Sequence, residues 1–360
     1  MNMTIVGGGN IGTQFAAHAG AKGHRVTMYS PHAELFSSKL RVVNEDGATI
    51  LEGALSCATH NPEEAFSYAD LVFVTTPAFM MNSVANEMVA HLREGSAVCL
   101  VPGTGGGECA FAPILNKGCA VFGLQRVPSV ARLVKYGEVV CASGYRDALF
   151  GAALPNSCSD AYSAVISDLF DMPCESLANY LDVTLTPSNP ILHTSRLYCL
   201  FRDYHDGVTY DHAPLFYGDW DEDSSVLLLQ LDEEVQRVCA ALSMFDLSGV
   251  RSLREHYESS TPEELTQKIR SIQSLHRLSS PMKPVSAGGL VPDLGSRYFT
   301  ADFPYGLSIL VQIAQFAGVP TPGMDLVIHW YRNLAHPKIE FSFSSFGINR
   351  LEDFVAFYSR

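Results

Sequence analysis

Residues 3–12 read M-T-I-V-G-G-G-N-I-G, and this stretch at the start of the chain decides the fold class. Gly7, Gly9 and Gly12 form the pattern G-x-G-x-x-G directly after a short apolar run, and a helix-like stretch follows over residues 13–23. In this order of strand, tight turn and helix, the pattern is typical of dinucleotide-binding folds. A second strand-like run, residues 25–29, supports that interpretation, whereas a glycine-rich turn that binds nothing is the alternative.

Each position of the motif has its own expected function. Gly7 permits the turn, Gly9 lets a pyrophosphate approach the backbone, and Gly12 lets the helix pack closely against the strand. The N–H groups at Asn10 and Ile11 begin the helix, where free donors and the positive end of the helix dipole hold an anion. We therefore expect these five residues to bind a dinucleotide.

The composition predicts a globular protein with room for two domains, because 360 residues contain 47% hydrophobic and 17% charged side chains. A net charge of −14 argues against nucleic acid or an anionic membrane as the main partner. No apolar run approaches the roughly 18 residues of a membrane span, and the chain starts with a strand rather than a signal peptide. Nine cysteines without C-x-x-C spacing are typical of a reducing compartment. We expect a cytoplasmic protein with no metal site.

The first half of the chain alternates strand-like and helical segments, which predicts a parallel sheet. Apolar runs at 71–76, 97–101 and 119–123 continue the series begun by the first two strands. Ligands gather at the carboxyl ends of such strands, so the loops 7–12, 75–79 and 103–107 are expected to border one crevice. Pro77 and Thr104 are the candidate cofactor contacts in the later loops, although the last of these loops could also be a flexible turn.

After about residue 185 the strand-like alternation gives way to helical patterns. These patterns cover residues 225–244, 262–275, 305–317 and 321–334. The fold class predicted is α/β, with a Rossmann-type parallel sheet in residues 1–185 and a mainly helical domain in residues 186–360. The boundary is expected between residues 182 and 188.

The residue that ends the second strand usually selects the nicotinamide cofactor, since a carboxylate there binds the ribose 2′-OH and repels a 2′-phosphate. This chain has Ser30 at that point. Lys39 and Arg41 lie further along and could reach a phosphate only if the loop folds back. NADPH and NADH both stay open, with NADPH favoured because the excluding charge is missing.

A histidine near the start of the helical domain is the candidate general acid/base. In the segment S-N-P-I-L-H, residues 188–193, Pro190 suits the first helical turn and Asn189 is the expected N-cap. His193 then lies on the same face as Asn189, close to the helix N-terminus. An imidazole there suits proton transfer, although a structural histidine in the core is the alternative.

Two charged residues stand in the otherwise uncharged segment 296–306. The planar fork of Arg297 suits a substrate carboxylate. Asp302 could orient His193 and stabilise its imidazolium form, as the carboxylate does in catalytic triads. An internal ion pair between Arg297 and Asp302 is the alternative interpretation.

These motifs resemble the opine dehydrogenase family of the octopine/nopaline type. The resemblance rests on the N-terminal glycine pattern, on N-P-I-L-H at 189–193 and on R-Y-x-T-x-D-x-P-Y-G at 297–306, and it spans essentially the whole chain. It implies a Rossmann domain joined to a helical domain. It also implies an enzyme that reductively condenses an amino acid with a 2-oxo acid, using NADH or NADPH.

The resemblance also implies roles for individual residues. His193 and Asp302 would form the catalytic dyad, and Arg297 would hold a substrate carboxylate. Arg132 falls on a characteristic arginine of the family, but Ala131 stands where relatives have cysteine, and Arg132 as a simple salt-bridge residue is the alternative.

Two other functions are consistent with the same domain plan. Ketopantoate reductases and glycerol-3-phosphate dehydrogenases share it, but they depend on a catalytic lysine near the start of the helical domain. No lysine occurs between Tyr136 and Gln267, which counts against them. A sensor that binds NAD(P) without turnover would have no need of a proton-transfer dyad. A homodimer is compatible with the sequence, which does not decide the oligomeric state.

Overall fold

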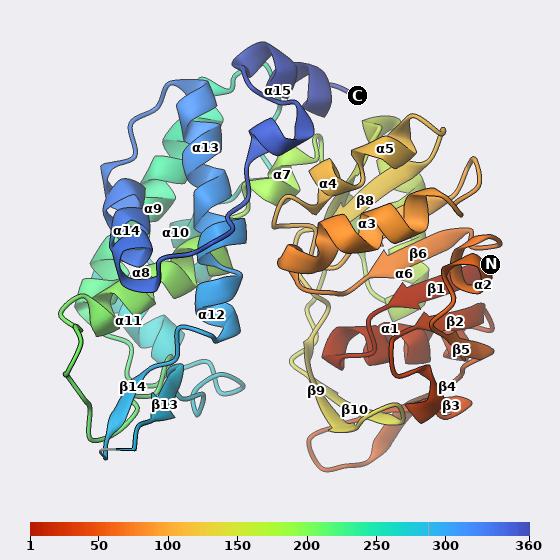
Figure 1. Cartoon of the computed structure of the whole chain (residues 1–360), viewed down its shortest axis with the longest axis horizontal. Coiled ribbons are helices and arrows are strands. Elements are labelled where there is room, and N and C mark those ends of the chain that lie inside the picture. Colours follow the sequence, from red (N-terminus) through yellow and green to blue (C-terminus); the bar gives the residue numbers. More distant parts are fainter. Residues whose placement is uncertain (287) are drawn as a thin grey trace. The chain divides into compact units, whose positions relative to one another are not determined.

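The computed structural model describes residues 1–286 and 288–360 and divides the chain into two compact units (Figure 1). Unit 1 comprises residues 1–184 and 355–360, and unit 2 comprises residues 185–354. The sequence assigned the last six residues to the helical domain, and that assignment is wrong. Tyr358 is fully buried in unit 1, where its hydroxyl donates to Glu108 at 2.7 Å and its carbonyl accepts from Asn179 at 2.9 Å.

An eight-stranded sheet forms the centre of unit 1, in the order β12-β11-β8-β7-β6-β1-β2-β5. Its strands are β1 (Asn2–Val6), β2 (Arg25–Tyr29), β5 (Cys57–Thr59), β6 (Leu71–Val74), β7 (Ala97–Leu100), β8 (Ala120–Leu124), β11 (Leu149–Leu154) and β12 (Cys174–Ser176). The pairs from β5 to β8 are all parallel, as the alternation of strands and helices predicted. β11 runs antiparallel to β8.

The order of the strands brings the predicted loops together. β7, β6 and β1 are neighbours in the sheet and run parallel, so the loops that follow them lie along one edge. Residues 3–6 of β1 are buried, and β6 and β7 are buried over their whole length. This burial accounts for the nearly continuous apolar sequences of the three strands. The glycine motif therefore stands beside the other two loops.

The helices of unit 1 are α1 (Asn10–Ala21), α2 (Pro62–Phe66), α3 (Met81–Val89), α4 (Gly107–Ala110), α5 (Ala112–Leu115), α6 (Ser159–Phe170) and α7 (Leu181–Thr184), with short 3-10 turns η1 (Ala33–Leu35), η2 (Ala78–Met80) and η3 (Asn156–Cys158). α1 connects β1 to β2 as the motif requires. Its buried residues, including Phe15, join the hydrophobic core of the main sheet. The Phe15 ring packs against Phe73 at a centroid distance of 5.1 Å.

A second, four-stranded sheet in unit 1 was not predicted. It has the order β4-β3-β10-β9 and consists of β3 (Lys39–Val43), β4 (Thr49–Ala54), β9 (Val130–Lys135) and β10 (Val139–Ser143). α1 packs against it as well as against the main sheet (Figure 1). Gly20 of α1 and Gly53 of β4 permit the close approach, because a Cβ on Gly53 would lie 1.9 Å from the carbonyl oxygen of Ala17.

Unit 2 is mainly helical, as predicted. Its elements are α8 (Asn189–Phe201), α9 (Glu222–Ala241), α10 (Leu253–Tyr257), α11 (Pro262–Arg270), β13 (Met282–Pro284), β14 (Leu290–Pro292), α12 (Arg297–Thr300), η4 (Phe303–Leu307), α13 (Ser308–Ala317), α14 (Pro322–Ala335), η5 (Phe343–Phe346) and the start of α15 (Leu351–Tyr358). The short antiparallel pair β13–β14 was not anticipated. Buried aromatic rings fill the core, and Phe303 stacks on Tyr331 with centroids 4.2 Å apart. Within the described residues, no helix has the length and apolar character needed to cross a membrane.

Candidate active site

The glycine motif forms the turn between β1 and α1. Gly7 has φ = +98°, a backbone conformation that favours glycine. A Cβ on Gly12 would lie 1.8 Å from the carbonyl oxygen of Gly7, so α1 can pack this closely only with glycine there. The hydroxyl of Thr75, from the neighbouring loop, donates to the carbonyls of Val6 at 2.9 Å and Gly7 at 3.1 Å.

The space beside Gly9 fits a dinucleotide. A Cβ on Gly9 would have no neighbour within 4 Å, so packing within the protein does not require glycine at this position. The backbone N–H of Thr13, in α1, donates to the carbonyl oxygen of Gly9 at 3.0 Å. The preceding N–H groups, on Asn10, Ile11 and Gly12, therefore start the helix without helical acceptors. Open space next to such donors is what a pyrophosphate needs.

The side chain of Asn10 has a partner within unit 1. Its amide oxygen accepts a hydrogen bond from the backbone N–H of Leu133, on β9, at 2.8 Å. The side chain thus ties the start of α1 to the second sheet, and the anion-binding role of the backbone N–H stays a prediction. Pro77 and Thr104 lie in the loops after β6 and β7 and are partly exposed, and their contacts with a cofactor stay predictions.

The position that ends β2 is covered by aromatic side chains. Ser30 is only 2% exposed, and its hydroxyl lies 3.3 Å from that of Tyr136 and accepts from the backbone N–H of His32 at 3.2 Å. The ring of Tyr136 in turn packs against Phe36 at 5.3 Å. Lys39 pairs with Glu52 at 2.9 Å on the second sheet. A cofactor would therefore meet neutral groups at this position.

In unit 2, the structure brings His193 and Asp302 together. Nδ1 of His193 lies 2.8 Å from a carboxylate oxygen of Asp302, and their side chains are 10% and 19% exposed. Because the carboxylate accepts from Nδ1–H, the second ring nitrogen, Nε2, is left as an acceptor. Of the two alternatives raised for these residues, the ion pair of Asp302 with Arg297 does not form, and Asp302 bonds His193 instead.

Local structure fixes this pair. His193 lies in the first turns of α8, and Asp302 directly precedes the π-helical turn η4. π-Helical turns occur often at functional sites. Gly306 within η4 packs on Pro190 of α8, because a Cβ there would lie 3.1 Å from two side-chain carbons of Pro190. This close contact holds η4 against the beginning of α8, and thus the carboxylate against the imidazole.

Tyr217 is a member of the site that sequence reasoning missed. Its hydroxyl lies 2.8 Å from Nε2 of His193, and the residue is 6% exposed. The rings of Phe216 and Tyr298 also pack around the imidazole, at 5.4 and 4.7 Å. Residues 204–220 form an aromatic and acidic stretch, and nothing in the sequence singles out one tyrosine within it.

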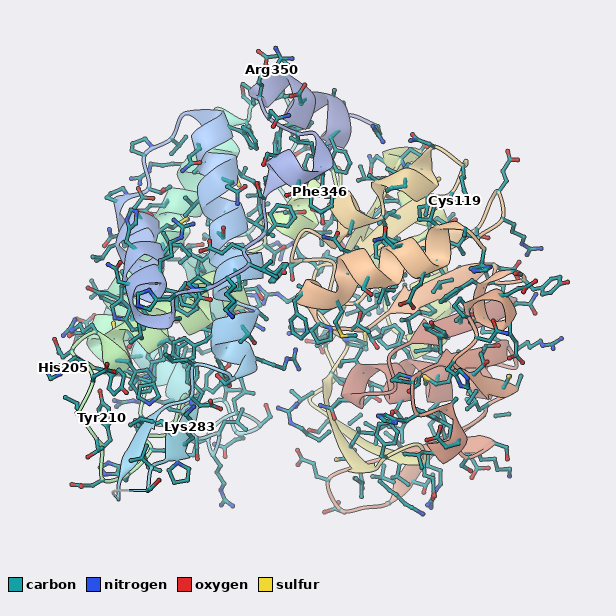
Figure 2. All side chains as sticks on the ribbon, in the orientation of Figure 1. Cys119, His205, Tyr210, Lys283, Phe346 and Arg350 are labelled. Carbon is teal, nitrogen blue, oxygen red and sulfur yellow. The ribbon has the colours of Figure 1, made fainter. Side chains whose placement is uncertain are left out.

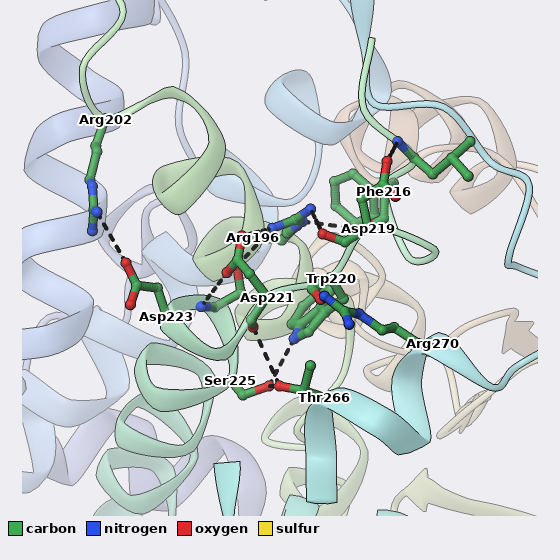
Figure 3. A network of polar contacts seen from close by, with 12 residues as sticks. Arg196, Arg202, Phe216, Asp219, Trp220, Asp221, Asp223, Ser225, Thr266 and Arg270 are labelled. Carbon is green, nitrogen blue, oxygen red and sulfur yellow. Dashed lines mark hydrogen bonds and ion pairs between the residues drawn. The ribbon is translucent and has the colours of Figure 1, made fainter. Parts of the chain in front are cut away.

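A buried arginine holds the segment that carries Tyr217 (Figure 3). Arg196, on the same helix as His193, is 1% exposed and donates to the carbonyls of Phe216 at 3.2 Å and Asp219 at 2.6 Å. It also pairs with the carboxylate of Asp221 and lies over the Trp220 ring, 5.5 Å from its centroid. Burial acts to raise the pKa of Asp221, but hydrogen bonding within the network and the nearby guanidinium hold that pKa below its ordinary value.

The same network reaches α11. The indole N–H of Trp220 donates to Ser225 at 2.9 Å, and that hydroxyl lies 2.6 Å from the hydroxyl of Thr266. Arg270 donates to the carbonyl of Trp220 at 2.6 Å (Figure 3). The segment from Phe216 to Asp221 is therefore tied to three helices, α8, α9 and α11.

Asn189 and Arg297 are both exposed, and neither contacts the His193–Asp302 pair through a hydrogen bond or ion pair found among the described residues. Ser188, not Asn189, is the N-cap of α8, so the capping prediction is wrong; Pro190 moves the cap one residue earlier by occupying the second helical position. Asn189 is exposed, and no hydrogen bond of its side chain is found among the described residues. Arg297 is also exposed, at the start of α12, and its neighbour Tyr298 touches His193. Catalytic roles for Asn189 and Arg297 stay predictions.

Arg132 does not form the salt bridge raised as an alternative. Its guanidinium donates to the carbonyl of its neighbour Ala131 at 2.9 Å, on β9.

The outer part of the stretch 204–220 is polar and exposed, and His205 and Tyr210 lie in the loop after α8 (Figure 2). Tyr210 pairs with Leu290 of β14, next to the strand that carries Lys283. The aromatic residues of this stretch thus serve both packing and the site.

No group of three or more histidine, cysteine, aspartate or glutamate side chains suited to a metal ion is found among the described residues.

Two family models match the chain. Residues 2–108 match the N-terminus of NAD-dependent glycerol-3-phosphate dehydrogenase, and residues 176–335 match the α-helical domain of NAD/NADP octopine/nopaline dehydrogenase.

Known relatives extend the similarity over nearly the whole chain. Tauropine dehydrogenase of Arabella iricolor is 27% identical, with 92% of this chain and 91% of the relative covered. Opine dehydrogenase of Haliotis discus hannai is 29% identical over 77% and 72%. Over nearly its whole length, the chain is thus similar to members of the opine dehydrogenase family. It is an NAD(P)-dependent oxidoreductase.

The fold agrees with this family. A solved structure of octopine dehydrogenase with NADH and L-arginine superimposes with a TM-score of 0.85 at 23% identity, covering 98% of this chain and 97% of that one. The family models and the relatives confirm the resemblance drawn from the motifs. The superposition agrees with the predicted plan of a Rossmann sheet followed by a mainly helical domain.

Proposed function

We propose that this protein condenses an amino acid with a 2-oxo acid and reduces the resulting imine to a secondary amine. The observation that carries the proposal is the buried pair of His193 and Asp302, joined at 2.8 Å in the helical domain of this family. The reduced nicotinamide, NADH or NADPH, supplies the hydride when it is bound. The open space beside Gly9 and the first N–H groups of α1 would hold its pyrophosphate.

The residues of unit 2 handle the proton and the substrate carboxylate. Asp302 accepts from Nδ1–H of His193, which fixes the tautomer and stabilises the imidazolium when the ring takes up a proton. Arg297 would neutralise a carboxylate of the 2-oxo acid through its planar fork. The expectation that His193 faces the nicotinamide stays a prediction.

A substrate screen tests this function. Oxidation of NADH or NADPH is followed with a panel of amino acids and 2-oxo acids, offered singly and in pairs. A signal that requires both partners is expected. A signal with ketopantoate alone would instead identify a ketopantoate reductase, and silence with every pair would favour a sensor.

Two variants test the assigned residues. His193→Ala should lose most of its turnover while its affinity for the reduced cofactor is retained, because unit 1 holds the glycine motif. Arg297→Ala should mainly raise the KM for the 2-oxo acid, because the substrate carboxylate would lose the planar fork that neutralises it. Near-normal turnover of folded His193→Ala would remove the imidazole from the reaction.

Cofactor preference and setting are part of the same proposal. Ser30 carries no charge that would exclude a 2′-phosphate, so we expect NADPH to bind more tightly than NADH. Equal affinities in titrations would show that Ser30 does not select. No disulfide joins any of the nine cysteines, which supports a cytoplasmic location. A homodimer stays a prediction that sedimentation of the purified protein would test.

A further inference from the structure

Both ring nitrogens of His193 are hydrogen-bonded within the chain. Nδ1 bonds the carboxylate of Asp302 at 2.8 Å, and Nε2 bonds the hydroxyl of Tyr217 at the same distance. A proton that moves between the imidazole and a substrate therefore has to pass through one of these two partners, or one of them has to move away. An ionised carboxylate only accepts hydrogen bonds, whereas a hydroxyl both donates and accepts.

The surroundings of Tyr217 hold it in place. The carbonyls of Phe216 and Asp219, on either side of it, accept from the guanidinium of Arg196 on the helix that carries His193. The phenol ring is buried, packs on Phe216 at 5.1 Å and stacks with Trp220 at 6.5 Å and an angle of 17°. Movement of the ring away from Nε2 would break this packing.

We propose that Tyr217 extends the Asp302–His193 pair into a proton relay and that its hydroxyl is the group that exchanges a proton with the substrate. This inference rests on the proposed function, because it concerns the proton of the same condensation. It assigns a catalytic role to a residue that lies outside the motifs from which the site was predicted.

The relay balances in both directions. In condensation, the imidazolium gives its Nε2 proton to the oxygen of Tyr217, and Tyr217 gives its own hydroxyl proton to the hydroxyl of the carbinolamine formed by the two substrates. The C–O bond of the carbinolamine breaks, water leaves and the protonated imine forms, carrying the positive charge that the imidazolium gave up, while Tyr217 and His193 both end neutral. In the reverse direction, water adds to the protonated imine and the same atoms return a proton to Nε2.

Tyr217→Phe is the first test, since it keeps the ring and removes the hydroxyl. We expect kcat to fall at least about tenfold, equivalent to about 1.4 kcal/mol, with the KM of both substrates and the Kd of the reduced cofactor changed less than about twofold. The solvent isotope effect on kcat should change from one that fits two moving protons to one that fits a single proton. A purely structural hydroxyl would not alter the number of protons.

Tyr331→Phe is the matched control. Tyr331 is also buried in unit 2, and no hydrogen bond of its hydroxyl is found in the part of the chain that the structure describes. Its kcat and isotope effect should match those of the wild type. If Tyr217→Phe does not fold, fluorinated tyrosines at position 217 keep the shape of the side chain, and kcat should then follow the acidity of the phenol.

The outcomes separate the two proposals. A wild-type chain that shows no turnover dependent on both substrates would overturn the proposed function together with the relay. An active wild type with unchanged kcat and isotope effect in Tyr217→Phe, or with a rate independent of phenol acidity, would overturn the relay alone. A rise in kcat in Tyr217→Phe would also overturn it, since the hydroxyl would then only block the imidazole.

Discussion

Replacement of Arg196 by methionine should destabilise unit 2 by about 2–4 kcal/mol. Methionine keeps most of the apolar stem and removes the guanidinium, so the loss comes from the groups that the guanidinium now satisfies. The carbonyl of Phe216 belongs to a fully buried residue, and leaving it unpaired costs about 1–3 kcal/mol. Asp219 is exposed and the side chain of Asp221 is 47% exposed, so water can take the place of the guanidinium at the Asp219 carbonyl and at the Asp221 carboxylate. Each of these two groups therefore adds less than about 1 kcal/mol to the loss of stability.

Urea unfolding followed by tryptophan fluorescence measures this loss. The chain has two tryptophans, and both lie in unit 2, with Trp220 directly under the Arg196 guanidinium. Arg202→Met is the matched control from the same helix region. The side chain of Arg202 is 44% exposed and pairs with Asp223 at 3.1 Å, so its replacement should cost less than about 1 kcal/mol.

The reasoning predicts a clear difference between the two variants. It would be refuted if Arg196→Met unfolded within about 1 kcal/mol of Arg202→Met, because buried carbonyls would then tolerate the loss of their donor. Turnover of Arg196→Met should also fall further than its stability alone explains, since the segment that carries Tyr217 loses its attachment to α8.

Two further predictions concern the glycine motif and a buried carboxyl. Gly9→Ala should change the free energy of unfolding by less than about 1 kcal/mol and weaken cofactor binding about tenfold. Gly12→Ala should weaken cofactor binding and also destabilise unit 1 by more than about 1 kcal/mol, because its Cβ would overlap the carbonyl oxygen of Gly7. Thermal unfolding and cofactor titration separate the two, and equal effects would contradict this account. Burial raises the pKa of Asp232 from 3.8 to about 6, so the folded state binds the proton more tightly and stability falls as the pH rises from 3.8 through 6. Asp232→Asn keeps an acceptor for the N–H of Leu253 and should remove about 3 kcal/mol of that decline in stability. Urea unfolding at about pH 4 and pH 7 measures the decline, and an unchanged decline in the variant would exclude Asp232 as its source.

The pair at the centre of the site could be predicted because each member stands in a short, distinctive segment. His193 follows a proline at a helix start, and Asp302 stands in a stretch with a single other charge, so the types of residue limited the chemistry. Their contact at 2.8 Å was a hypothesis about two segments more than a hundred residues apart, and the packing of Gly306 on Pro190 brings it about.

Other features depend on packing that leaves no local pattern. Tyr217 is one of several aromatic residues in its segment, and only the folding of that segment onto Arg196 places its hydroxyl on His193. The second sheet escaped prediction because one of its pairings joins residues 39–43 with residues 139–143, about a hundred residues further along the chain. The return of Tyr358 to unit 1 depends on a buried carboxyl, Glu108, whose pKa is raised by that burial.

By itself, the sequence determined the class of the protein. Strand, glycine turn and helix follow one another within residues 2–21, and the periods of apolar residues distinguish a parallel sheet from a helical domain, so short-range steric rules and patterns suffice. The tertiary structure alone decided which side chains complete the site, such as Tyr217 at the imidazole of His193. It also decided which side chains are hydrogen-bonded within the protein instead, such as Ser30 with Tyr136. The physical reason is that a hydrogen bond between distant segments depends on how their backbones pack, and no single segment contains that information.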